Sequence, residues 1–162
     1  MAARVETGGI RAANVATGVP VLDHLLTLLA RSGGFELSLE LAPGEAEAEV
    51  AEAGRSLGDA FAPLLRADSA AGHGSAVVPA QEALAQVALE ISTESLLASN
   101  VDLSAARAGG LHSDLAARFL ESFAEAAGIT LHVRLIDGED SQHVLEAIFK
   151  ALGGALAQAS RA

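Results

Sequence analysis

Three side chains near the end of the chain have the types and the spacing to do chemistry. His143, Glu146 and Lys150 follow one another at intervals of three and four residues, so they share one arc of a predicted helix. An imidazole and a carboxylate can hold a divalent cation or exchange protons, and an ammonium group can bind an anion. The same pattern also suits a solvated helix face, on which a Glu146–Lys150 ion pair contributes about 0.2–0.5 kcal/mol.

A metal site would need further ligands, because two side chains one helical turn apart rarely hold an ion and tight sites use three or four. His24, next to Asp23 on an earlier predicted helix, completes a single-ion site if it lies nearby. By default it is an ordinary helix histidine, so both interpretations stay open. The other histidines are expected at the surface: His73 and His112 in glycine-flanked loops, and His132 on the less buried side of a strand.

The composition describes one compact domain with a large aliphatic core. The 162 residues are 51% hydrophobic but only 3% aromatic, and the absence of cysteine excludes disulfides and thiolate metal sites. With a formal net charge of −11 and scattered basic residues, the chain lacks the positive surface that nucleic acid requires. We find neither a signal peptide nor an apolar run of the roughly 20 residues that a membrane span needs, so we expect a cytoplasmic protein without a membrane partner.

Two segments alternate apolar and polar residues in strict period two, which predicts strands with one buried face. They are residues 35–41 (FELSLEL) and 129–135 (ITLHVRL). An amphipathic helix precedes each strand, and a glycine turn and a second helix follow it. The apolar stripes of these helices run over residues 22–29, 50–64, 115–123 and 145–156. Between the two units, residues 75–79 predict a strand that Pro79 ends. The composition around residues 83–91 favours a helix, but their period-two alternation favours a strand, which we expect here.

This helix–strand–turn–helix order occurs twice, which predicts a duplication. The offset between the copies is 94 residues from Gly34 to Gly128, and it rises to 95 after the turn, where Gly58 aligns with Gly153. We therefore predict a single α+β domain of two pseudo-repeats in which helices cover the sheets. The two repeats are residues 1–66 and 67–162.

Four stretches of the chain resemble the imidazoleglycerol-phosphate dehydratase family of histidine biosynthesis. They are TGVPVLDHLLTLLARSGGFELSLEL, GSAVVPAQEALAQVALEIS, AGITLHVRLIDG and HVLEAIFKALGGAL, and their order and spacing agree with the family over most of the chain. The resemblance implies duplicated β-β-α-β-α-type halves, with two mixed sheets flanking a layer of four helices, a fold of the ribosomal protein S5 domain 2-like type. It also implies a homo-oligomer, a trimer or a 24-subunit shell built from trimers, with active sites between subunits.

The family reaction removes water from imidazole glycerol phosphate, a small imidazole phosphate, and gives imidazole acetol phosphate. The resemblance implies two manganese ions that ligate the imidazole ring and stabilise it as an imidazolate during the elimination. Imidazole and carboxylate ligands suit manganese, and basic side chains would hold the substrate phosphate. Lys150 alone keeps a matching substrate-contact position.

The metal ligands implied by the resemblance are only partly present. The family's His-His-x-x-Glu motif reads Gln142–His143–x–x–Glu146 in the second half and Glu47–Ala48–x–x–Ala51 in the first. Arg118 stands where a further ligand histidine is expected, whereas the Asp23–His24 pair is kept. The metal ligands that remain are His24, His143 and Glu146, and the last two are also the catalytic candidates. We therefore expect one manganese ion or none.

The phosphate site implied by the resemblance departs further. The family's Arg-Arg-Tyr-Gly reads Ala71–Gly72–His73–Gly74, its Ser-Gly-Arg-Pro reads Ser92–Thr93–Glu94–Ser95, and its Asp-Glu reads Gln81–Glu82. Glu94 thus places a negative charge where an arginine would meet the phosphate. The chain also lacks the family's C-terminal Ser-Thr-Lys-Gly segment, and its N-terminal hairpin is shortened and has lost a glutamate near the substrate.

Three functions are compatible with this sequence. The first is a divergent but active dehydratase, and the second is a catalytically impaired or inactive family member that serves as an oligomeric structural or interaction protein, alone or in a shell mixed with an intact relative. The third is a small-ligand binder that reuses the cleft. The replaced metal and phosphate ligands favour a protein that keeps the family fold and has lost most or all of the chemistry.

Overall fold

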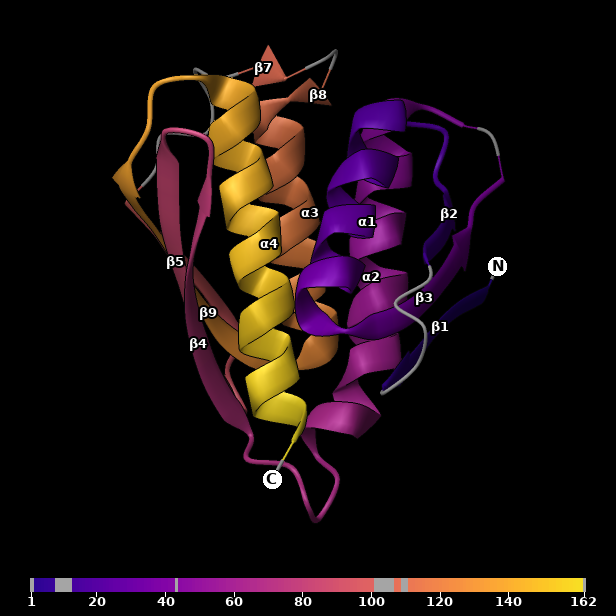
Figure 1. The fold of residues 1–162 in the computed structure, drawn as a ribbon. Coiled ribbons are helices and arrows are strands. Elements are labelled where there is room, and N and C mark those ends of the chain that lie inside the picture. The colour runs from indigo at the N-terminus through magenta and orange to yellow at the C-terminus, as the bar shows by residue number, and fades with distance from the viewer. Residues whose placement is uncertain (1, 8–12, 43, 101–106, 109–110, 162) are drawn as a thin grey trace.

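The computed structural model describes residues 2–7, 13–42, 44–100, 107–108 and 111–161. Four helices form a central layer, and two sheets cover this layer on opposite sides (Figure 1). The helices are α1 (Pro20–Gly33), α2 (Ala46–Leu65), α3 (Ser113–Ala127) and α4 (Ser141–Ser160). α1 packs against α4 and α2 packs against α3, so each helix of one half meets a helix of the other half.

The two sheets repeat one pairing pattern. The first sheet has the order β1 (Ala2–Thr7), β3 (Phe35–Glu40) and β2 (Ala13–Ala16), and β3 runs antiparallel to β1 and parallel to β2. The second has the order β4 (His73–Ala80), β5 (Ala83–Ile91), β9 (Ile129–Asp137) and β6 (Leu96–Ser99), and β9 runs antiparallel to β5 and parallel to β6. A short pair, β7 (Arg107–Ala108) and β8 (Leu111–His112), precedes α3. The predicted α+β class of duplicated halves with mixed sheets is therefore confirmed, while the boundary between residues 66 and 67 stays a prediction.

Start and stop signals in the sequence lie where the helices begin and end. Pro20 opens α1, and Gly34 ends it with a φ of 71°, a left-handed conformation that glycine adopts without strain. Gly128 plays the same part after α3, with a φ of 68°. The prediction that Pro79 ends a strand was wrong, because β4 continues through it to Ala80. Proline is tolerated there since β4 is an edge strand, and its missing amide hydrogen can face away from the ladder.

The helix layer encloses the core. All five phenylalanine rings are fully buried, and they form a continuous chain of contacts through the layer: Phe35, Phe61, Phe123, Phe119 and Phe149. The inward faces of β3, β5 and β9 contribute the aliphatic remainder, as the period-two alternation predicted. Among the described residues, no helix combines the length and the apolar character that crossing a membrane requires.

Glycines let the paired helices approach backbone to backbone. A Cβ atom on Gly153 of α4 would lie 2.2 Å from the carbonyl oxygen of Leu29 in α1. A Cβ atom on Gly58 of α2 would lie 2.7 Å from the carbonyl oxygen of Phe123 in α3. These two contacts are equivalent in the repeat, because Gly58 aligns with Gly153 and Leu29 with Phe123. The duplicated glycine therefore sets the spacing of both helix pairs.

We predict that Gly153→Ala and Gly58→Ala each destabilise the protein by about 1–3 kcal/mol, because the added methyl group must push two helices apart. Gly44→Ala is the matched control, since a Cβ atom there meets only the Glu49 side chain at 3.8 Å. Urea unfolding followed by circular dichroism measures the difference. Equal unfolding midpoints for all three variants would contradict a backbone-to-backbone crossing.

Candidate functional site

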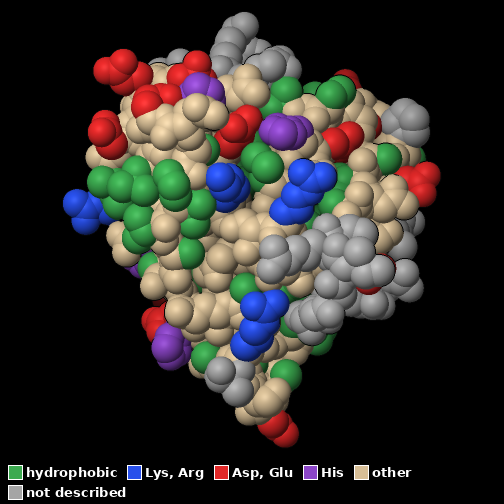
Figure 2. All heavy atoms as spheres, viewed as in Figure 1, with side chains coloured by type: hydrophobic (Ala, Val, Ile, Leu, Met, Phe, Trp, Pro, Cys, Tyr) green, Lys and Arg blue, Asp and Glu red, His purple; other side chains and the backbone are tan. Residues whose placement is uncertain are grey.

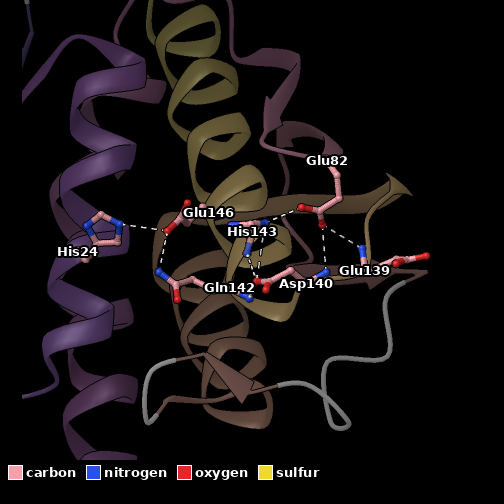
Figure 3. Close-up of polar contacts among 7 residues, drawn as sticks. All are labelled: His24, Glu82, Glu139, Asp140, Gln142, His143 and Glu146. Atoms are coloured by element: carbon pink, nitrogen blue, oxygen red, sulfur yellow. Dashed lines mark hydrogen bonds and ion pairs between the residues drawn. The ribbon is translucent and has the colours of Figure 1, made fainter.

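Two of the predicted metal ligands meet where α1 crosses α4. The Nε2 atom of His24 lies 3.2 Å from Oε2 of Glu146, and the same oxygen accepts a hydrogen bond of 3.1 Å from Nε2 of Gln142 (Figure 3). Glu146 is the more enclosed partner, with 18% of its side chain exposed against 53% for His24. The condition set for a site with His24, that it lies near the polar face of the last helix, is thus met, although its role as a ligand stays a prediction, and the contact joins the two halves of the molecule.

His143 points to a different carboxylate. Its Nδ1 atom lies 2.5 Å from Oε1 of Glu82, which follows β4 in the turn before β5. The other oxygen of Glu82 accepts hydrogen bonds from the backbone amides of Glu139 and Asp140, at 3.1 and 3.0 Å. Asp140 in turn caps α4, because its side chain accepts the amides of Gln142 and His143. Glu82 therefore ties the β4–β5 turn to the start of α4 and orients the imidazole (Figure 3).

The hydrogen bond between Glu82 and His143 shifts the pKa of both side chains. Hydrogen bonds from the Asp140 amide, from His143 and from the Glu139 amide lower the pKa of Glu82 from 4.5 to about 2. The hydrogen bond to Glu82 raises the pKa of His143 above 6.5, partial burial opposes that rise, and the charge of Asp140 adds to it. Because the Nδ1 proton is held by Glu82, the lone pair of the neutral ring lies on Nε2. That nitrogen is available as a base or a ligand.

Lys150 does not pair with Glu146, so the Glu146–Lys150 ion pair expected for a solvated helix face is not formed. The Nζ atom of Lys150 donates to the carbonyl oxygen of Pro79 at 2.9 Å, and the Lys150 carbonyl accepts from Oγ of Ser32 at 2.7 Å. The polar arc of α4 thus lies along the seams with α1 and β4 rather than in open solvent. Figure 2 shows acidic side chains and two histidines at the upper end of this face, with basic side chains below them over α1 and α4.

The second helix crossing carries an ion pair in the corresponding place. Nη2 of Arg118 in α3 lies 3.0 Å from Oε1 of Glu47 in α2, and both side chains are more than half exposed. In the repeat alignment Arg118 corresponds to His24, and Glu47 corresponds to Gln142. The two positions where the resemblance implies ligands of the first-half site therefore hold each other. Ala48 and Ala51, the remaining positions of that motif, offer no donor atoms.

Other predicted site residues lie apart from these pairs. Asp23 accepts hydrogen bonds from the hydroxyl and the amide of Thr17, at 2.6 and 2.9 Å, so it fixes the approach to α1. His73 and His132 are exposed, as predicted. The prediction that His73 and His112 lie in loops was wrong, because His73 begins β4 and His112 ends β8. The side chain of His112 lies outside the described residues. Glu94 is exposed and belongs to a turn in which its amide donates to the hydroxyl of Ser92.

Sequence reasoning missed the structural roles of Glu82, Asp140 and Gln142. In the sequence, Glu82 stands out only as half of the family's Asp-Glu motif, which reads Gln81–Glu82 here. In the structure it lies in a turn opened by Gln81, whose φ is 55°. Asp140 stands directly before the helix at Ser141, a position at which aspartate is a common cap. That signal was available, whereas the contact between Glu82 and His143 depends on tertiary structure.

The single chain does not fit a two-manganese centre. Among the residues that the structure describes, no group of three or more His, Asp or Glu side chains is placed to share an ion. His24 and Glu146 face each other, His143 is turned to Glu82, and Arg118 brings a permanent positive charge to the other crossing. No chemical step through a pair of metal ions follows from these residues. The metal, catalytic and substrate roles of His24, His143, Glu146 and Lys150 stay predictions.

Comparison with known proteins shows that most of the chain resembles one family. The sequence profile described as imidazoleglycerol-phosphate dehydratase matches residues 17–156. The imidazoleglycerol-phosphate dehydratase of Pelobacter propionicus is 40% identical over 153 residues, which cover 91% of this chain and 78% of that protein. The enzyme of the same name from Syntrophobacter fumaroxidans is 41% identical over 154 residues, with 92% and 78% covered.

Solved structures agree with the sequence comparison. The imidazoleglycerol-phosphate dehydratase of Staphylococcus aureus superimposes with a TM-score of 0.88 at 30% identity, over 98% of this chain and 92% of that one. The Pyrococcus furiosus protein of the same family, solved in complex with (S)-C348, gives a TM-score of 0.85 at 28% identity, over 98% and 88%. These likenesses extend across both halves and both sheets.

We predict that Glu82→Gln lowers the pKa of His143 toward 6.5, because the neutral amide no longer stabilises the imidazolium. A titration of the His143 ring by NMR measures the change. Glu139→Gln is the matched control, since it removes a neighbouring exposed carboxylate while leaving the amide that contacts Glu82. If both variants titrate like the parent protein, Glu82 does not hold the His143 proton.

Proposed function

We propose that this chain, which belongs to the imidazoleglycerol-phosphate dehydratase family of histidine biosynthesis, has a strongly reduced or absent capacity for the family reaction. That reaction, the loss of water from imidazole glycerol phosphate, requires the removal of a poorly acidic proton. A base alone is insufficient for such a step unless positive charge stabilises the developing anion. The proposal concerns how much of that stabilisation this chain retains.

The ion pair between Glu47 and Arg118 carries the proposal. A metal ligand must give up its proton, which histidine can do near neutral pH and arginine cannot. At 3.0 Å from Glu47, the Arg118 guanidinium neutralises the carboxylate that stands at a motif position of this crossing. With Ala48 and Ala51 in the remaining motif positions, the first-half site has no donor set for a cation.

The crossing of α1 and α4 retains the residues that any remaining chemistry would use. We assign His143 as the candidate base, because Glu82 fixes its Nδ1 proton and leaves Nε2 open. Glu146 is the candidate second catalytic group, and Lys150 is the candidate contact for the substrate. One manganese ion or none is the proposed metal content, with His24, His143 and Glu146 as its ligands. The direct contact of His24 with Glu146 supports this set of ligands.

A structural role in a homo-oligomer is the second candidate function. Four large aliphatic side chains are 40–54% exposed, which is unfavourable unless a partner covers them: Val77, Ile91, Leu96 and Ile136. Ile91 and Leu96 both lie at the end of the second sheet where β9 begins, since their register partners are Ile129 and Thr130. We propose that this end of the sheet contacts another copy of the chain, in a trimer or a 24-mer.

The metal content and the turnover test the proposed impairment. After incubation with excess manganese and removal of the unbound ion, we predict fewer than two manganese ions per chain. We also predict a kcat/KM at least about a hundredfold below that of the Staphylococcus aureus dehydratase assayed in parallel, since disturbing even the outer partners of a metal site costs about 10–100-fold. His143→Ala is the control that separates residual turnover from contamination. Two manganese ions per chain, with a turnover comparable to that of the Staphylococcus aureus enzyme, would contradict the proposal.

The oligomeric state tests the structural role. We predict that light scattering after size exclusion gives a mass several times the 16.3 kDa of the chain. Leu96→Glu should shift the protein toward smaller species, because it places a charge on an aliphatic side chain that is 54% exposed in the isolated chain. Thr93→Glu, at an exposed polar position in the neighbouring turn, is the matched control. A monomeric parent protein would rule this role out.

A further inference from the structure

The outer face of the second sheet carries a hollow that the dehydratase chemistry does not use. It measures about 500 Å³ and is lined by side chains from β5, β9 and the end of β6, among them Gln86, His132 and Arg134. α3 and α4 cover the inner face of the same sheet, so the sheet separates the hollow from the contacts of His24, His143 and Glu146. The hollow is thus a distinct feature of the molecule.

Small residues on both sides of one histidine create the hollow. In the strand register His132 lies between Ala88 of β5 and Ala98 of β6. Because both neighbours are alanine, neither side chain is long enough to cover the imidazole. Arg134, two residues along β9, points to the same face, and its register partner on β5 is Gln86. An imidazole, a guanidinium and an amide therefore surround one depression.

The charge of this hollow is opposite to that of the protein. The chain has a formal net charge of −11, yet no Asp or Glu lines the hollow. Each of four other hollows formed by described residues includes at least one carboxylate. Within the described part of the chain, the side chains of Arg134 and His132 have no hydrogen-bond or ion-pair partner. On so acidic a protein, an exposed guanidinium without a carboxylate beside it has its N–H donors open to an anion.

The surroundings limit the size of the ligand. A second hollow continues from Ala88 and His132 toward β4, and Glu90 lines it. A carboxylate at that end repels any anion that extends beyond His132. The positive part is therefore confined to the space around Arg134, His132 and Gln86.

We propose that this hollow binds a small oxyanion, a phosphate or a carboxylate group, on Arg134, His132 and Gln86. The guanidinium offers two parallel N–H donors to a pair of oxygens, the imidazole adds an N–H donor, and the Gln86 amide adds another. Ala88 and Ala98 leave the space that the anion occupies. The proposal is independent of the proposed loss of dehydratase activity, because none of its residues contributes to the helix crossings.

An NMR titration of the full-length protein tests the site. Inorganic phosphate and acetate are added in separate experiments at constant ionic strength set with sodium chloride, and the ring signals of His132 and the Nε–H signal of Arg134 are followed. We expect saturable shifts with at least one of the two anions, and the anion that saturates identifies the oxyanion class. Arg134→Gln should raise Kd about tenfold or more, since a charge-assisted hydrogen-bond partner is lost.

Two further variants separate a built site from general attraction to positive charge. Arg31→Gln removes one exposed positive charge on α1, remote from the sheet, and should leave Kd unchanged. Ala98→Leu fills the hollow without changing charge, and should weaken binding while the unfolding midpoint stays near that of the parent protein. Shifts that do not saturate, or that respond equally to Arg134→Gln and Arg31→Gln, would overturn the proposal. An unchanged Kd in folded Ala98→Leu would overturn it as well.

Discussion

The contact on which the structure depends is the backbone-to-backbone crossing of paired helices. At Gly153 and at Gly58 there is no room for a methyl group between one helix and a carbonyl oxygen of the other. This spacing is short enough for side chains one to three turns away to meet across each seam. His24 reaches Glu146 at one crossing, and Arg118 reaches Glu47 at the other. A feature that serves packing thereby also fixes which polar groups can act together.

The two crossings differ in the chemistry that their pairs permit. The His24–Glu146 pair consists of an imidazole and a carboxylate, which are both side-chain types that bind divalent cations. The Arg118–Glu47 pair is permanently charged and satisfies itself, which leaves nothing for a cation to replace. The duplication has therefore kept its geometry, while the side chains that meet at its two helix crossings differ. The hydrogen bond between Glu82 and His143 is a further difference between the two halves, because the first half has an alanine, Ala48, in place of His143.

The sequence was sufficient for the fold and for part of the site. Period-two alternation located β3, β5 and β9, and proline and glycine punctuation located the ends of α1 and α3, because these signals are local. The short strands β1, β2 and β6 gave no clear pattern, since four to six residues at a sheet edge carry little periodicity. The sequence placed His143, Glu146 and Lys150 on one helix face. Their contacts with His24, Glu82 and Pro79 were not predicted, because Glu146 and His24, His143 and Glu82, and Lys150 and Pro79 lie 122, 61 and 71 residues apart and no local rule joins them.

Anomalous diffraction at the manganese edge, from crystals grown with manganese and without phosphate, tests the central claim most directly. We predict no anomalous peak between Glu47 and Arg118, with their ion pair intact, and one peak or none beside His24 and Glu146. Two neighbouring manganese ions, each with a full set of protein ligands drawn from this chain and its neighbours, would contradict it.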